Sequence, residues 1–203
     1  MAFPYTPAFL DNALTYAAYR ETTRDELTQP PKDEAAQKMR GHIERNARLM
    51  DEYDLTYKLS SSLRDALEHS IPATWVVITE PWCGDAAFNV PMFAAIECAF
   101  PRKVKLALFL RDSNPELIDA NLTDGGRSIP KLIVLNENLE EVGSWGPRPA
   151  GLQEKTKAWK NKGLPIRELI PLVQAWYDAD GTKSVQQELE RVINSYSVEG
   201  PAS

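Results

Sequence analysis

Four short runs of strand-forming residues lie between residues 75 and 145, and their order constrains the fold more than any other feature. The runs cover residues 75–79, 104–110, 131–135 and 141–145. The first is almost continuously apolar, which is typical of a buried strand. A helix is expected from residue 85 to about residue 100, and a shorter one follows Asn114-Pro115, an N-cap with proline at the first helical position. The expected order from residue 71 is strand, helix, strand, helix, strand, strand, helix.

This order predicts a mixed four-stranded sheet. Two strands joined through a helix run parallel, with a right-handed crossover. The turn at residues 136–138 instead joins the last two strands as an antiparallel hairpin. The fold class is therefore α/β, with helices on the faces of a mixed four-stranded sheet.

Helical patterns flank the strands on both sides. We expect one helix from residue 7 or 8 to about residue 23, a second from about residue 33, and a third ending near residue 69. Two or three helices close the chain, the clearest over residues 166–177 and the last over about 185–196, before a disordered tail at 198–203. We divide the chain into an N-terminal helical extension (1–70), an α/β domain (71–160), and C-terminal helices with the tail (161–203).

Composition and charge exclude several classes of function. Lysine and arginine number 23 against 29 aspartates and glutamates, a net charge of −6 that argues against a nucleic-acid surface. No apolar run is long enough to span a membrane, and the N-terminus does not resemble a secretory signal. The two histidines lack partners at metal-ligand spacing, and two cysteines make no disulfide framework. We therefore expect a cytoplasmic protein with no metal site and no cofactor.

The clearest motif lies in the turn between the strand expected at residues 75–79 and the helix expected from residue 85. It reads Pro81-Trp82-Cys83-Gly84-Asp85-Ala86. Trp82-Cys83-Gly84 matches the start of the W-C-G-P-C motif of the thioredoxin superfamily. Ile129-Pro130 matches the Ile-Pro that these proteins keep, with a cis peptide bond, opposite the active-site cysteine. With the element order, residues 71–146 and the helix after them resemble that superfamily. The resemblance implies a three-layer thioredoxin-like fold and a groove beside Pro130 in which a partner's extended backbone docks.

Four longer motifs resemble an uncharacterised bacterial branch of thioredoxin-like proteins. That branch carries E-x-W-C-G-D-A, R-D-x-N-P-E, G-G-R-S-I-P-K and W-G-P-R-P. In this chain the motifs occupy residues 80–86, 111–116, 125–131 and 145–149. The match is specific for membership of the branch, and it carries little information about activity.

Cys83 lies where a thioredoxin-like fold would activate a thiol, but the motif contains no second cysteine. A helix N-terminus favours the thiolate, whereas the nearby Asp85 opposes it, so the sign of the pKa shift stays open. Ala86 replaces the resolving cysteine of dithiol enzymes. Cys98 lies about 22 Å farther along a helix, beyond the roughly 7 Å that a disulfide allows, and is expected to be a buried small hydrophobe.

Two functions follow from this motif. The first is monothiol exchange through Cys83 with an external thiol or a protein disulfide, which predicts that iodoacetamide labels Cys83 much faster than Cys98. The alternative is a redox-inactive binding module that recognises a peptide or partner protein at the cis-Pro groove. A monothiol holding an iron–sulfur cluster across a dimer is a third, weaker reading.

The candidate binding residues lie around this cysteine. They are Trp82, Gly84, Asp85, Arg127, Ile129 and Pro130. Arg127 and Arg148 could hold a ligand carboxylate, such as that of a small thiol, although solvated or salt-bridged surface arginines are the commoner case. Asp112 and Glu80 are expected to pair with those arginines.

Overall fold

The computed structural model describes residues 3–197, so the tail expected to be disordered, residues 198–203, lies outside the described residues. The helices are α1 (Pro7–Leu10), α2 (Tyr16–Thr28), α3 (Glu34–Thr56), α4 (Ser61–His69), α5 (Gly84–Ala99), α6 (Pro115–Ala120), α7 (Ala150–Asn161), α8 (Ile166–Asp180) and α9 (Lys183–Ser197). The strands are β1 (Ala73–Thr79), β2 (Val104–Leu110), β3 (Lys131–Leu135) and β4 (Glu141–Trp145).

The strands form one sheet in the order β2-β1-β3-β4. β1 runs parallel to β2 and antiparallel to β3, and β4 is antiparallel to β3. β1 is central, so its side chains are covered on both faces, which explains its nearly continuous apolar sequence. The prediction of an α/β fold with a mixed four-stranded sheet is confirmed.

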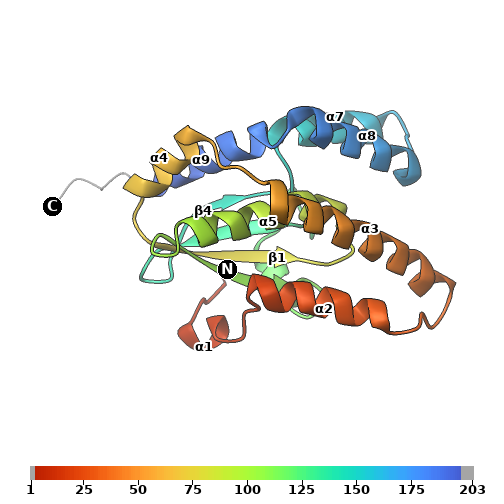
Figure 1. The fold of residues 1–203 in the computed structure, drawn as a ribbon, viewed down its shortest axis with the longest axis horizontal. Coiled ribbons are helices and arrows are strands. Elements are labelled where there is room, and N and C mark those ends of the chain that lie inside the picture. The colour runs from red at the N-terminus through yellow and green to blue at the C-terminus, as the bar shows by residue number, and fades with distance from the viewer. Residues whose placement is uncertain (1–2, 198–203) are drawn as a thin grey trace.

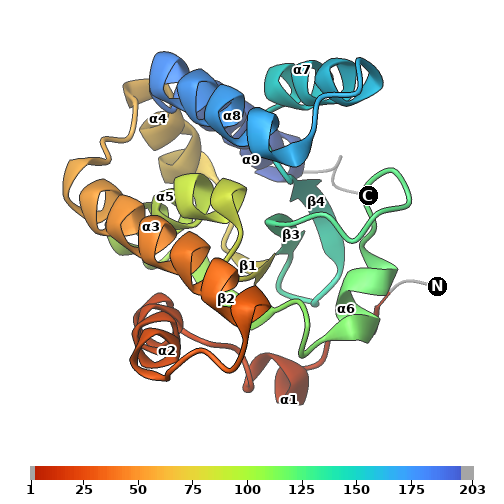
Figure 2. The same cartoon turned by 90° about the vertical axis from the view of Figure 1, so that its right-hand side faces the viewer.

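Helices cover the sheet from both sides. In Figures 1 and 2, α4, α7, α8 and α9 lie above the sheet, and α1 and α2 lie below it. The main core joins the sheet to both helical extensions, because Tyr19 of α2, Leu63 of α4 and Leu189 of α9 are fully buried in the same apolar cluster. The flanking helices therefore complete the hydrophobic core of the α/β unit.

The first expected helix is in fact two. Helix α1 ends at Leu10 and α2 begins at Tyr16, while Leu14 between them pairs with Leu108 of β2 as an isolated antiparallel bridge. The backbone N–H of Leu14 donates to the Leu108 carbonyl over 2.8 Å. Thr15 then caps α2, its hydroxyl accepting a hydrogen bond from the Ala18 N–H. A tertiary contact thus replaces helix continuation, which the local sequence pattern does not reveal.

Candidate functional site

The turn after β1 places Cys83 at the start of α5. The Cys83 N–H donates to the Glu80 carbonyl over 3.1 Å, which closes the turn. Cys83 is the N-cap of α5, with an extended backbone conformation, and its own carbonyl accepts from the Ala87 N–H. The thiol therefore faces the unpaired N–H groups of the first helical turn.

Cys83 also faces the loop before β3. The Ile129-Pro130 peptide bond is cis, and the Cys83 thiol donates a hydrogen bond to the Ile129 carbonyl over 3.3 Å. Gly146 packs against the far side of this loop, at a φ of +118°, where a Cβ would come within 2.2 Å of the Pro130 carbonyl oxygen. The juxtaposition of cysteine and Ile-Pro implied by the thioredoxin resemblance is present.

Cys83 is held as a protonated thiol. It is 8% exposed. Burial, followed by the negative charge of Asp85, raises its pKa to about 12. The N–H groups of Asp85 and Ala86 and the positive charge of Arg148 act in the opposite direction but do not compensate. The sequence leaves the direction of the pKa shift of Cys83 open, and the structure shows that it is upward. Little of the thiol is therefore ionised at neutral pH.

Asp85 belongs to a buried polar network that joins three parts of the chain. Its carboxylate forms an ion pair with Arg148, whose Nε lies 3.1 Å from Oδ1. The Tyr177 hydroxyl of α8 donates to the same oxygen over 3.0 Å. The Asn89 amide donates in turn to the Tyr177 hydroxyl, also over 3.0 Å. Because the partners of Asp85 come from the β4–α7 loop and from α8, those elements fix the start of α5.

The other side of the turn is fixed by the loop after β2. The buried Glu80 carboxylate accepts a hydrogen bond from the Asp112 N–H over 2.8 Å, and burial raises the pKa of Glu80. The Arg111 guanidinium stacks over the Trp82 ring at 4.7 Å. Glu80 and Asp112 do not pair with Arg127 and Arg148 as expected. The Glu80 carboxylate bonds to the Asp112 backbone, because both residues lie at the same end of the parallel strands β1 and β2. The Asp112 carboxylate instead forms an ion pair with the neighbouring Arg111, at 2.8 Å.

The structure brings most of the predicted site residues together. Around Cys83 it places Trp82, Gly84, Asp85, Ile129 and Pro130. Arg127 lies two residues before Ile129, but its guanidinium does not reach Cys83. It donates two hydrogen bonds of 2.6 Å to the Asp119 carboxylate instead. Arg148 does reach the site, through Asp85.

The prediction for Cys98 is wrong, because this cysteine is exposed. It lies in the last turn of α5 on the face away from the sheet, whereas Ile96, two residues earlier and about 200° around the helix, is fully buried. The sequence does not indicate Tyr177 or Asn89 as site residues. Tyr177 lies at the end of the helix expected over residues 166–177, and no local signal links either residue to Asp85.

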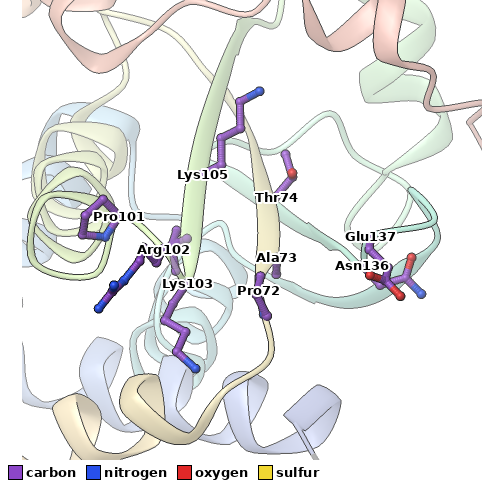
Figure 3. Close-up of a pocket in the computed structure, with 10 residues that line it drawn as sticks. Pro72, Ala73, Thr74, Pro101, Arg102, Lys103, Lys105, Asn136 and Glu137 are labelled. Atoms are coloured by element: carbon purple, nitrogen blue, oxygen red, sulfur yellow. The ribbon is translucent and has the colours of Figure 1, made fainter.

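A small hollow at the opposite end of the sheet is a poor candidate for function. It has a volume of about 180 Å³ and lies where β1 and β2 begin, far from the Cys83 turn. Figure 3 shows that its charged side chains diverge, with Lys105 pointing away from Arg102 and Lys103. The Lys103 ammonium is moreover bonded to the Ser70 carbonyl at 2.6 Å. Polar groups that bind a ligand would converge.

The part of the chain that the structure describes contains neither a metal-binding cluster nor a membrane-spanning helix. Between residues 3 and 197 no three His, Cys, Asp or Glu side chains gather closely enough to hold a metal ion. Within the same range no helix combines the length and the apolar character needed to cross a membrane.

Comparison with known proteins agrees with the geometry of the site. The thioredoxin family model matches residues 30–160. A protein of unknown function from Pseudomonas aeruginosa has a similar structure, with a TM-score of 0.60, 18% identity, and coverage of 94% of this chain and 98% of that one. An HIV epitope-scaffold is similar to the same extent, with a TM-score of 0.60, 16% identity and the same coverage. No curated protein matches the chain. Because the family match spans well over half of the sequence, and because the sheet, the Cys83 turn and cis-Pro130 agree with it, the chain belongs to the thioredoxin family.

Proposed function

We propose that this chain is a thioredoxin-fold recognition module that binds an extended peptide segment of a partner protein beside Pro130. The observation that carries the proposal is the protonated, buried state of Cys83 next to a segment with free backbone donors. Within residues 3–197, no group accepts a hydrogen bond from the N–H of Arg127, Ser128 or Ile129. An extended peptide can pair with such a segment by strand addition.

The surroundings of Cys83 support recognition over turnover. A pKa near 12 lowers the thiolate fraction at neutral pH about a thousandfold relative to an ordinary thiol, and the thiolate is the species that attacks a disulfide. The Cys83 hydrogen is engaged by the Ile129 carbonyl. Peptide recognition therefore ranks above monothiol exchange, which is the reverse of the order that the sequence favours.

Monothiol exchange is the second candidate, and a specific observation favours it. The N–H groups of Asp85 and Ala86 and the charge of Arg148 all stabilise a Cys83 thiolate. In this reaction the thiolate attacks one sulfur of a disulfide, forms a mixed disulfide and releases the other sulfur as a thiolate. A second, external thiolate then attacks the partner sulfur of the mixed disulfide, takes it into a new disulfide and releases Cys83 as a thiolate.

One labelling experiment separates the two candidates. At pH 7 we expect iodoacetamide to modify the exposed Cys98 while Cys83 reacts at least a hundredfold more slowly, as followed by intact mass and peptide mapping. In urea both cysteines should react alike, which controls for intrinsic reactivity. The Cys98→Ser variant isolates the Cys83 rate. Labelling of native Cys83 as fast as Cys98 would favour monothiol exchange.

A second measurement addresses recognition directly. Peptides selected from a random library on the Cys83→Ser variant should slow amide hydrogen exchange at residues 127–129, whose N–H groups have no partner among the described residues. Selected peptides that protect other segments would contradict the proposed groove.

We also propose that the protein is located in the reducing cytoplasm, because both cysteines are free thiols. We further propose that it belongs to the W-C-G-D-A branch of thioredoxin-like proteins.

A further inference from the structure

A second cavity lies beside the Cys83 turn but apart from the Pro130 groove. It has a volume of about 520 Å³ and is enclosed by α3, the start of α5, α7 and α8. We name it the helical cavity. Trp82, Gly84 and Asp85 form part of its wall, whereas Cys83, Ile129 and Pro130 do not line it. Its volume falls within the range of sites that bind small molecules.

Most of the wall of the helical cavity is apolar. Leu49 of α3, Phe88 of α5, and Leu169 and Val173 of α8 line it. Ile166 belongs to the same wall and is 74% exposed. Since a predominantly apolar lining is typical of sites for small molecules, the cavity suits the apolar body of a ligand.

The charged groups of the cavity are mostly cationic. Arg45 of α3, Lys160 of α7 and Arg148 line it, and Asp85 is the only acidic side chain among the described residues of its wall. The Asp85 carboxylate is already engaged by Arg148 and Tyr177. Within residues 3–197, neither Arg45 nor Lys160 forms an ion pair. This positive surface stands out in a chain with a net charge of −6, and it is complementary to an anion.

We propose that the helical cavity binds a small amphiphilic carboxylate, with its apolar body between α3 and α8 and its carboxylate near Arg45 and Lys160. This binding does not depend on whether Cys83 reacts or on whether the Pro130 groove holds a peptide. The half-buried His42 adds a further donor on the α3 side. An apolar wall with a few placed polar groups is the usual composition of a small-molecule site.

Calorimetric titration with decanoate tests the proposal on the full chain. Decanoate should bind with a stoichiometry of one and a dissociation constant of about 0.1–1 mM, as expected for a ligand of this size. Decyltrimethylammonium, which carries the opposite charge on the same alkyl chain, should bind at least about tenfold more weakly.

Matched variants locate the carboxylate. The double variant Arg45→Gln/Lys160→Gln should bind decanoate about tenfold more weakly, since each exposed charge contributes a few-fold. The control Arg48→Gln/Lys155→Gln removes the same charge from exposed positions of α3 and α7 outside the cavity, and should stay within about twofold of the parent. The proposal is overturned if decanoate does not saturate, if both amphiphiles bind alike, or if the two double variants weaken binding equally.

Discussion

Cys83 couples folding to pH, because its proton is held more tightly in the folded chain. An ordinary thiol has a pKa of 9.0, and that of folded Cys83 is about 12. Between these values the unfolded chain loses a proton that the folded chain keeps, so this contribution to stability falls as pH rises above 9. We expect the parent protein to lose about 1.4 kcal/mol of unfolding free energy from pH 7 to pH 10 that Cys83→Ser does not lose. Urea unfolding of both proteins at the two pH values measures the difference.

The comparison with Cys83→Ser also removes the contribution of buried tyrosines. Burial raises the pKa of Tyr177 and Tyr57 well above the ordinary value as well, and both remain in the variant. Their effects cancel in the difference between the two proteins. Parallel stability curves from pH 7 to pH 10 would mean that Cys83 is not buried as a thiol.

The sequence predicts where Cys83 lies but not its protonation state. The strand–turn–helix pattern and the Ile129-Pro130 pair correctly place the thiol at a helix start opposite a cis-proline. The sign of the pKa shift depends instead on how deeply the surrounding chain buries the sulfur. That burial is a tertiary property, and the Ile129 carbonyl that the thiol contacts and the Arg148 charge that acts on it both come from distant segments of the chain. The prediction for Cys98 is wrong for a similar reason, because an almost wholly apolar helix does not reveal which of its faces packs on the sheet.

The Asp85 carboxylate of α5 accepts hydrogen bonds from both Tyr177 of α8 and Arg148 of the β4–α7 loop. We expect Asp85→Asn to lower the free energy of unfolding by about 3 kcal/mol, because the substitution leaves the charge of Arg148, whose side chain is only 16% exposed, unpaired. It should also accelerate iodoacetamide labelling of Cys83, because the Asp85 charge is the second cause of the raised thiol pKa. Urea unfolding and labelling rates measure the two effects.

An exposed ion pair provides the matched control for Asp85. Asp119 pairs with Arg127 in a similar two-contact geometry, but both side chains are about half exposed, at 50% and 52%. Because solvent screens such a pair, Asp119→Asn should change stability far less than Asp85→Asn and leave Cys83 labelling unchanged. Equal destabilisation by both variants would show that the buried network around Asp85 has no special role.

At the scale of the whole molecule, helices α2, α4 and α9 share the main hydrophobic core with the sheet. Leu152 of α7 and Tyr177 of α8 form a second, smaller cluster with Phe88 of α5. The sequence predicted the helices outside the thioredoxin-like region from their own apolar faces. It could not say that Leu189 of α9 would be buried with Trp75 of β1 and Tyr19 of α2, because residues distant in sequence show no pairing signal. The same lack of long-range information explains the missed break at Leu14, which pairs with β2.

A shared core predicts cooperative unfolding, and Leu189 tests it. Leu189→Ala removes a fully buried side chain of α9 and should cost about 2–5 kcal/mol. Tryptophan fluorescence, which reports partly on Trp75 in the sheet, and far-ultraviolet circular dichroism should shift to the same lower denaturant midpoint. Leu172→Ala is the matched control, since Leu172 of α8 is 38% exposed and its loss should cost less than about 1 kcal/mol. If α9 unfolded independently of the sheet, the fluorescence midpoint of Leu189→Ala would stay at the parent value. Part of the circular dichroism signal would then be lost at a lower denaturant concentration. Coincident midpoints would mean that α9 and the sheet unfold as one cooperative unit.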